Sequence, residues 1–84
     1  MSSEIEVLAE YIRNETGFTG MLAPDDDLLE SGVLDSFNIV SLAMFAQERF
    51  GVEFEGEDIV RENLARLSSL AALIRKRKTG AGSQ

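Results

Sequence analysis

Residues 28–42 read LLESGVLDSFNIVSL, and this stretch decides where the main helix of the chain begins. Asp35 and Ser36 are both good N-cap residues, because their short side chains can accept hydrogen bonds from the amides of a first helical turn. Apolar residues then recur at helical spacing as far as Phe50, and Gly51 fits a C-terminal cap. We therefore predict a helix from about Ser36 to Phe50.

The predicted helix carries two apolar stripes. One of them suits a hydrophobic core, and its members are Ile39, Leu42, Ala43, Ala46 and Phe50. The other is rotated away from the first and consists of Phe37, Val40 and Met44. In so small a domain the second stripe is either covered by another element or offered to a partner. We favour the partner, because the first stripe already supplies a core face.

A second amphipathic helix is predicted at the N-terminus, from about Ser3 to Glu15. Its apolar residues follow the i, i+3, i+4, i+7 pattern and are Ile5, Leu8, Ala9 and Ile12. Ser2 or Ser3 can cap its beginning, and Gly17 ends it.

A long connection, residues 17–34, joins the two helices. It contains Gly17, Gly20, Pro24 and Gly32, which disfavour regular structure, together with the run Asp25-Asp26-Asp27. Seven apolar residues are scattered through it: Phe18, Met21, Leu22, Leu28, Leu29, Val33 and Leu34. We expect these side chains to hold the loop across the core.

The remainder of the chain predicts two further helices. A short helical turn is expected around Glu57–Arg61, and Ser68-Ser69 are expected to cap a last helix that carries Leu70, Leu73 and Ile74 and ends near Arg77. The predicted fold is an all-α four-helix bundle with a long first loop and a short third helix. We place the domain at residues 1–78 and treat residues 79–84 as a flexible tail.

The composition excludes several classes of function. The chain has 84 residues, no Cys and no His, with 15 acidic and 8 basic side chains and a net charge of −7. It therefore lacks thiolate nucleophiles, the commonest general base and the commonest transition-metal ligand of enzymes. Its acidity argues against nucleic-acid binding, and it has neither a secretory signal nor an apolar stretch long enough for a membrane span. We expect a cytoplasmic monomer that is not an enzyme.

All the acidic residues lie before residue 75, where they are accompanied by four basic ones. The run Arg75-Lys76-Arg77-Lys78 then reverses the sign. A basic run can bind nucleic acid or a membrane, but this one follows an apolar periodic segment. We interpret it as the cationic end of a helix, which the helix dipole favours.

Asp25-Asp26-Asp27 and Glu30 raise the possibility of a calcium site. An EF-hand loop that began at Asp25 would need Gly at its sixth position, where Glu30 stands. The alternative is a solvated turn in which Asp27 caps the residues after it. We favour the turn and predict no metal.

Ser36 is the residue on which functional chemistry is most plausible. No His or Cys is present to activate it, and the remaining bases, Lys76 and Lys78, are at the far end of the chain, so we do not expect it to act as an autonomous nucleophile. A helix N-terminus does stabilise an attached phosphate, through its unpaired amides and its dipole. From the residues alone, Ser36 is either a simple N-cap or a residue that another enzyme modifies.

The sequence around Ser36 resembles the attachment region of acyl carrier proteins. The resemblance rests on LLESGVLDSFNIVSL at 28–42, on Phe50-Gly51-Val52, and on Glu62-Asn63-Leu64 followed by Leu67-Ser68-Ser69-Leu70. It covers most of residues 4–75. It implies a carrier-type helical bundle and a covalent phosphopantetheine on Ser36, with Asp35 as the accompanying acid.

The resemblance also implies a set of partners. A phosphopantetheinyl transferase would prime Ser36 from coenzyme A, an acyl- or aminoacyl-loading ligase would charge the thiol as a thioester, and synthase or transferase enzymes would act downstream. In such carriers the second helix docks these enzymes, which here implies contacts through Phe37, Val40, Met44 and Glu48.

The sequence departs from fatty-acid carriers at two points. Phe37 stands where they usually have Leu, and the predicted second helix has only Glu48 as an acid. We therefore expect a free-standing carrier of specialised metabolism, such as a polyketide or related pathway, ahead of a primary fatty-acid carrier. The alternatives are an aminoacyl or D-alanyl carrier, an acidic helical adaptor in which Ser36 is only a cap, and a calcium-responsive domain.

Overall fold

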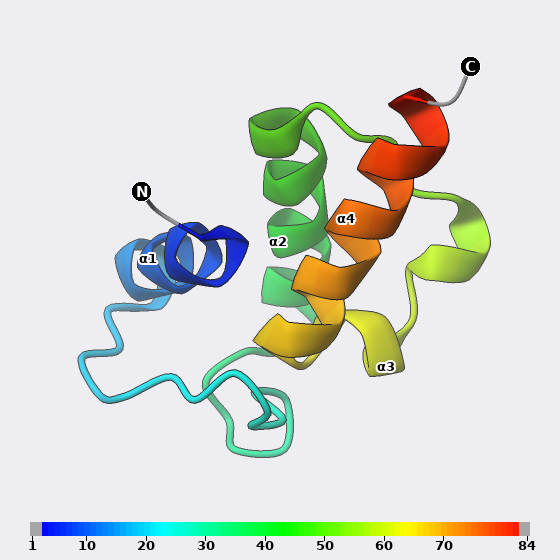
Figure 1. Ribbon diagram of the computed structural model, residues 1–84. Helices are drawn as coiled ribbons and strands as arrows, with labels where there is room; N and C mark the ends of the chain where they lie inside the picture. The colour runs from blue at the N-terminus through cyan, green and yellow to red at the C-terminus, as the bar shows by residue number, and fades with distance from the viewer. Residues whose placement is uncertain (1–2, 83–84) are drawn as a thin grey trace.

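The computed structural model describes residues 3–82, and the side chains as far as Lys78. Four α-helices occur in this part of the chain: α1 (Glu4–Thr16), α2 (Ser36–Phe50), α3 (Arg61–Leu64) and α4 (Leu67–Gly82). A single 3-10 turn, Gly56–Asp58, precedes α3, and residues 3–82 contain no strand. The predicted all-α bundle with a short third helix is confirmed (Figure 1).

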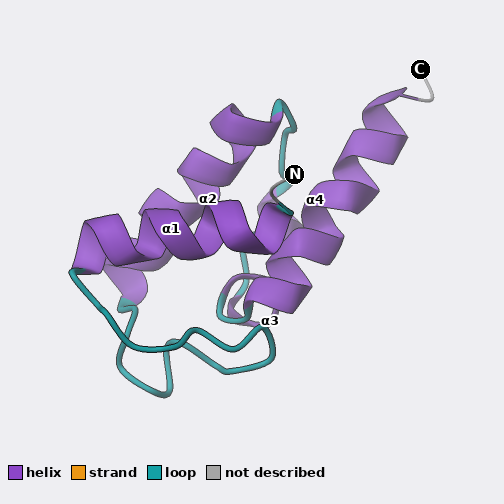
Figure 2. Ribbon diagram, turned by 60° about the vertical axis from the view of Figure 1, so that its left-hand side comes forward, coloured by secondary structure: helices purple, strands orange, loops and turns teal. Residues whose placement is uncertain are grey.

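Helices α2 and α4 lie next to one another, and α1 crosses them on one side (Figures 1 and 2). Helix α1 contacts both α2 and α4, and α3 packs mainly against α4. The loop between α1 and α2 passes across the same end of the bundle as α3. Leucine dominates the core that these elements enclose, and its fully buried large side chains are Leu8, Ile12, Leu28, Leu42, Leu64, Leu67, Leu70 and Ile74.

Both ends of α1 are as predicted. Ser3 is the N-cap: its Oγ accepts from the Glu6 amide at 3.2 Å, and Glu6 Oε1 accepts from the Ser3 amide at 3.0 Å. Gly17 ends the helix with a φ of 75°, a conformation that glycine adopts without steric cost, and its N–H donates to the Arg13 carbonyl at 2.8 Å.

The long loop is packed onto the bundle, as most of its apolar residues predict. Leu22, Leu28 and Leu34 are buried, and Phe18, Leu29 and Val33 pack partly buried against the core. The prediction is wrong for Met21, which is 87% exposed. Leu22 takes the inward position, so the side chain of its neighbour points to solvent.

Polar contacts attach this loop to the start of α4. The Leu28 amide donates to the Ala65 carbonyl at 2.8 Å, and the Ser68 amide donates to the Pro24 carbonyl at 2.9 Å. The Ser68 hydroxyl donates to Asp25 Oδ1, also at 2.8 Å. Residues more than 35 positions apart in the sequence therefore hold the loop in place.

Two expectations for residues 51–70 are wrong. The single turn expected at Glu57–Arg61 is in fact two turns, Gly56–Asp58 and α3, because Val60 between them is extended (φ −131°, ψ 157°). Ser68 and Ser69 do not cap the last helix, which already begins at Leu67, and the Leu70 amide donates to the Arg66 carbonyl at 3.0 Å. The buried side chain of Leu67 places this first turn against the core.

Helix α4 continues to Gly82 and does not end near Arg77. No proline interrupts residues 78–82, so the helical hydrogen bonding can continue through them. The expected tail extends beyond the described residues at 83–84, and the domain boundary after Lys78 stays a prediction.

The basic run belongs to the body of α4 and not to its last turn, so the dipole interpretation is corrected. Its cations pair with distant residues. Arg75 Nη2 lies 3.0 Å from Glu4 Oε1, and Arg77 donates to both carboxylate oxygens of Asp58, at 2.7 and 2.8 Å. These ion pairs connect α4 to the start of α1 and to the 3-10 turn.

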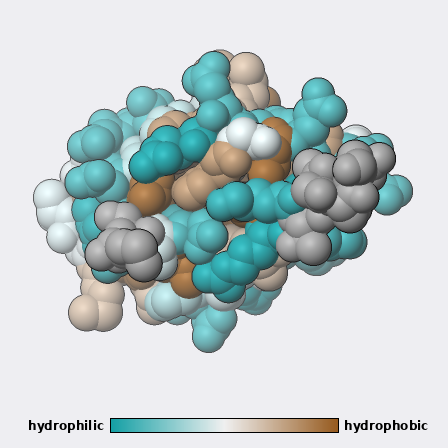
Figure 3. Space-filling view, turned by 45° about the horizontal axis from the view of Figure 1, so that its top comes forward, coloured by the Kyte–Doolittle hydropathy of each residue, from teal (hydrophilic) through white to brown (hydrophobic). Residues whose placement is uncertain are grey.

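None of the helices within residues 3–82 combines the length and the hydropathy that crossing a bilayer requires. The face seen in Figure 3 is mainly hydrophilic, and hydrophobic surface shows there only in separate areas between polar side chains.

Candidate functional site

The N-terminus of α2 is capped by Asp35. Its Oδ1 accepts hydrogen bonds from the amides of Phe37 at 3.0 Å and Asn38 at 2.8 Å. Asn38 returns the interaction, since its Oδ1 accepts from the Asp35 amide at 3.4 Å. Of the two residues predicted as possible caps, Asp35 takes this role, and the interpretation of Ser36 as only a cap is wrong.

Ser36 is the first helical residue and is exposed. Within the described part of the chain, its hydroxyl makes no hydrogen bond to another residue. It stands at the positive end of the dipole of a 15-residue helix. The hydroxyl is therefore accessible to an incoming enzyme, in a place where an attached phosphate is stabilised.

The loop before Ser36 is held firmly. Leu34 is buried, and its amide donates to the Leu28 carbonyl at 2.9 Å. Asp27 caps the preceding turn as predicted, because its Oδ1 accepts from the amides of Leu29 and Glu30, each at 3.0 Å. These backbone amides and the Arg61 guanidinium lower the pKa of Asp27, with the Glu30 amide as the largest cause.

Two residues of the acidic run, Asp25 and Asp27, form contacts within the protein. Asp27 Oδ2 pairs with Arg61 at 3.2 Å, and Asp25 accepts from Ser68 through its side chain and from Arg66 through its carbonyl. Within residues 3–82, no group of three or more acidic side chains is placed to hold a metal ion.

The two stripes of α2 separate as predicted. Ile39, Leu42, Ala43 and Ala46 are buried, and Phe50 is partly buried against the core. Phe37, Val40 and Met44 are 81%, 50% and 64% exposed. The alternative in which these three pack in the core is therefore excluded. Glu48, the fourth residue of the predicted partner face, is also exposed.

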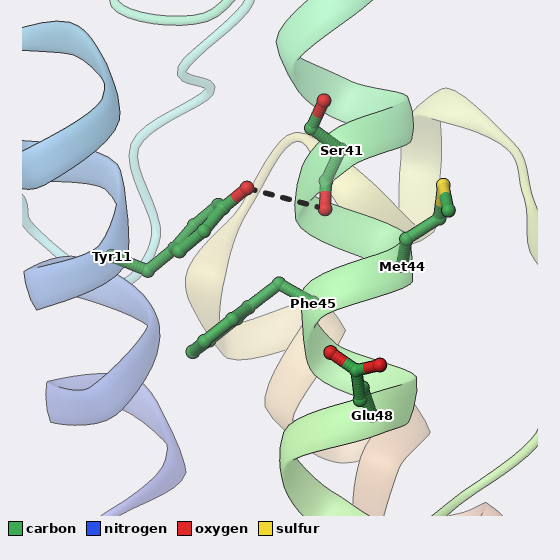
Figure 4. Close-up of a pocket in the computed structure, with 5 residues that line it drawn as sticks. All are labelled: Tyr11, Ser41, Met44, Phe45 and Glu48. Carbon is green, nitrogen blue, oxygen red and sulfur yellow. Dashed lines mark hydrogen bonds between the residues drawn. The ribbon is translucent and has the colours of Figure 1, made fainter.

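Sequence reasoning missed an aromatic pair between α1 and α2. The rings of Tyr11 and Phe45 are stacked, with centroids 4.1 Å apart and an interplanar angle of 12°. Tyr11, Ser41 and Phe45 line a shallow pocket together with Met44 and Glu48 (Figure 4). The available signal was one aromatic residue beside the apolar stripe of each helix, but nothing local indicates that the two rings meet.

The comparisons with known proteins assign a family to this arrangement. The family model described as phosphopantetheine attachment site matches residues 6–74, which include the Asp35-Ser36 pair, α2, α3 and the first half of α4. No curated protein and no solved structure matches the chain. Domains of this family are non-catalytic carriers to which phosphopantetheine is covalently attached. The chain belongs to this phosphopantetheine attachment family, the family of the acyl carrier proteins.

Proposed function

We propose that phosphopantetheine is attached to the Ser36 hydroxyl and that the primed chain carries acyl or aminoacyl groups between biosynthetic enzymes. The observation that carries this proposal is the position of Ser36: it is exposed, without a hydrogen-bond partner among the described residues, and first in α2. The match over residues 6–74 supports the assignment, because this hydroxyl lies within it.

The residues around Ser36 fit an attached phosphodiester. Asp35 Oδ1 already accepts from the Phe37 and Asn38 amides, so the dipole of α2, and not these two amides, would stabilise the phosphate. The dipole of α2 favours the negative charge of a phosphate at its first residue. The attached arm supplies a terminal thiol on which an acyl group is carried. The chain itself encodes no Cys, so the reactive sulfur has to be imported.

Phe37, Val40, Met44 and Glu48 form the partner face in this proposal. Phe37 directly follows the attachment residue, and the three apolar side chains are exposed along the same helix. An apolar stripe that water surrounds in the free protein is the kind of surface that a partner covers. The net charge of −7 would steer basic enzyme surfaces towards it.

The proposed partners are a phosphopantetheinyl transferase, a loading ligase, and synthase or transferase enzymes. Phe37 and the single acid on α2 favour a pathway of specialised metabolism, such as polyketide synthesis, over a primary fatty-acid synthase. An aminoacyl or D-alanyl carrier is the alternative cargo assignment. That the protein is free-standing, cytoplasmic and monomeric stays a prediction.

Intact-protein mass spectrometry tests the attachment site. The protein is incubated with coenzyme A, Mg²⁺ and a broad-range phosphopantetheinyl transferase, and the gain of one phosphopantetheine mass is expected. Ser36→Ala should abolish the gain. Ser31→Ala is the matched control, because Ser31 is an exposed serine of the loop between α1 and α2, and its loss should leave priming intact.

A wild-type protein that gains no mass contradicts the proposal and favours the acidic adaptor. A Ser36→Ala variant that is still modified contradicts the site. The circular dichroism spectrum of Ser36→Ala should match that of wild type, since the cap of α2 comes from Asp35.

A further inference from the structure

The shallow pocket between α1 and α2 is lined by side chains that favour aromatic contacts. Its volume is about 330 Å³, and its lining residues are Tyr11, Ser41, Met44, Phe45 and Glu48 (Figure 4). Tyr11 and Phe45 are the stacked pair, with ring centroids 4.1 Å apart. The Met44 side chain contains a thioether, which makes favourable contacts with aromatic rings. Two aromatic rings and a thioether therefore form the apolar lining of the pocket.

This pocket is open to solvent, in contrast to the core on the other side of α2. Leu42 and Ala46, which belong to the core face of the helix, are 0% exposed. Tyr11 and Phe45 are only partly buried, and the Tyr11 hydroxyl reaches from α1 to donate to the Ser41 carbonyl at 3.5 Å. A group that enters the pocket does not have to separate the helices, so it costs no core contact.

The pocket lies within reach of a chain attached to Ser36. Ser41, Met44 and Glu48 follow Phe37 by four, seven and eleven residues, so they share its face of α2. Along the helix axis these three residues lie about 8–18 Å from Ser36, at about 1.5 Å per residue. A phosphopantetheine arm has about fourteen bonds between the serine oxygen and the sulfur, which corresponds to about 16 Å when extended. A group carried on the arm can therefore reach the pocket.

The electrostatic field at the pocket is negative. The exposed Glu48 belongs to its lining, and none of the lining residues is a cation. Burial raises the pKa of Tyr11, and the negative charge of Glu15 raises it further, so the phenol is neutral at neutral pH and a second carboxylate acts on the pocket. Both carboxylates repel an anionic group, whereas an uncharged ring is not repelled.

We infer that this pocket receives the cargo when the arm lies back along α2, and that the cargo it suits is an acyl group with an uncharged aromatic ring. The inference rests on the proposed attachment to Ser36 and names the class of cargo. A cavity of about 150 Å³ already holds benzene, so a single ring fits here. Beside Tyr11, Phe45 and Met44 an aromatic ring gains more than an aliphatic one, because ring–ring and sulfur–ring contacts add to the burial of apolar area.

Attachment to the arm compensates for the shallowness of the pocket. A short flexible tether holds its end group at an effective concentration in the millimolar range. At an effective concentration of about 1 mM, a site with a dissociation constant of about 1 mM is occupied about half of the time. The same group at micromolar concentration in solution would leave the pocket almost empty. The site therefore suits the chain's own arm and not a free ligand.

NMR spectroscopy of the full chain with a stable loaded arm tests this inference. A broad-range transferase attaches the arm from amide analogues of benzoyl-, cyclohexanecarbonyl- and acetyl-coenzyme A, in which nitrogen replaces the thioester sulfur, and the intact mass verifies loading. The acetyl arm is the reference for effects of the arm itself. We expect nuclear Overhauser contacts from the benzoyl ring to the rings of Tyr11 and Phe45, with amide shifts at Ser41, Met44 and Glu48.

Two further arms test the preference for an uncharged aromatic ring. The docked population of the cyclohexanecarbonyl arm should be about two- to tenfold smaller than that of the benzoyl arm, since a ring of similar size lacks the π-system. A 4-carboxybenzoyl arm should dock about two- to fivefold less than the benzoyl arm, because Glu48 repels it. Glu48→Gln should reduce this second difference.

Ser41→Leu fills the pocket but keeps both rings and the Ser41 backbone carbonyl, so it should abolish the contacts of the benzoyl ring. Ala72→Leu is the matched control: it enlarges an exposed side chain of α4 outside the pocket and should leave these contacts unchanged. Circular dichroism verifies that both variants are folded. The comparison of the arms on the wild-type chain requires no variant.

A loaded protein in which the benzoyl ring does not contact Tyr11 and Phe45 overturns the inference, and so does docking that persists in Ser41→Leu. Equal docking of the cyclohexanecarbonyl arm overturns the preference for an aromatic ring, and equal docking of the 4-carboxybenzoyl arm overturns the preference for an uncharged one. The carrier function is tested separately. A protein that gains no arm contradicts that function, whereas a loaded protein without these contacts keeps it and loses only this pocket.

Discussion

Replacing Asp35 by alanine separates the capping role of this residue from its place beside the proposed attachment hydroxyl of Ser36. Alanine at an N-cap costs about 0.5–2 kcal/mol of stability. The upper half of that range applies here, because Asp35 Oδ1 accepts from two amides and alanine leaves both without this acceptor. We therefore expect Asp35→Ala to lower the free energy of unfolding by about 1.5 kcal/mol.

For a domain of this size that loss corresponds to a fall in Tm of about 6–12 °C, which thermal unfolding followed by circular dichroism can measure. Hydrogen exchange localises the effect: the amides of Phe37 and Asn38 should exchange faster in the variant, because they lose their acceptor. Asp26→Ala is the control, since Asp26 is an exposed aspartate whose carboxylate accepts no hydrogen bond within residues 3–82.

Asp35→Asn completes the series. Asparagine caps about as well as aspartate, so this variant should lose about 0.5 kcal/mol or less. Asp35→Lys should slow priming by the transferase more than it lowers stability, because it reverses the charge beside Ser36. The reasoning is refuted if Asp35→Ala and Asp26→Ala have the same Tm, or if charge reversal at Asp35 damages stability and priming equally.

Three further outcomes are expected. Gly51→Ala should cost about 1 kcal/mol in urea unfolding, because φ there is +67° while the space around a new Cβ is open; an unchanged midpoint would contradict the strain. The Arg77 guanidinium holds the pKa of Asp58 below its ordinary value of 3.8, so the pair stabilises the fold above that pH and loses its effect as the pH falls through the lowered pKa. Wild type should accordingly be more stable than Asp58→Asn at neutral pH, the difference closing in acid; a gap that persists below the lowered pKa would argue against an ionic origin. Phe37→Ser and Met44→Ser should change the unfolding free energy by less than about 0.5 kcal/mol, since both side chains are exposed, yet slow acyl loading by a partner ligase; unchanged loading would remove them from the partner face.

Much of this fold could be predicted because its signals are local. The bounds of α1 and α2 follow from a capping residue, an apolar period and a terminal glycine that lie within one segment. The exposed stripe of α2 follows from the same helical geometry, since residues on one face cannot also be on the other. From local signals alone Ser36 is either a cap or a modified residue, and its proposed role as the attachment residue rests on the resemblance to acyl carrier proteins.

Several of the errors occur where a side chain pairs with a residue that is distant in the sequence. Ser68 looks like an N-cap in its own segment, but its hydroxyl donates to Asp25, and α4 already begins at Leu67. The sequence places Arg77 near the expected C-terminal end of a helix, but its guanidinium pairs with Asp58, the last residue of the 3-10 turn. The Tyr11–Phe45 stack was missed for the same reason.

These distant contacts explain how a short segment such as α3 bears on the attachment region. Arg61, its first residue, pairs with Asp27 in the loop between α1 and α2. In the same loop, the Leu28 amide donates to the carbonyl of Ala65, the residue directly after α3. The Leu34 amide in turn donates to the Leu28 carbonyl, one residue before the cap of α2. The position of Ser36 therefore depends on a series of contacts that begins at α3, which follows Ser36 in the sequence. A substitution that loosens α3 should displace the Ser36 hydroxyl, at which we propose that the transferase acts, even though no residue of α3 belongs to the proposed partner face.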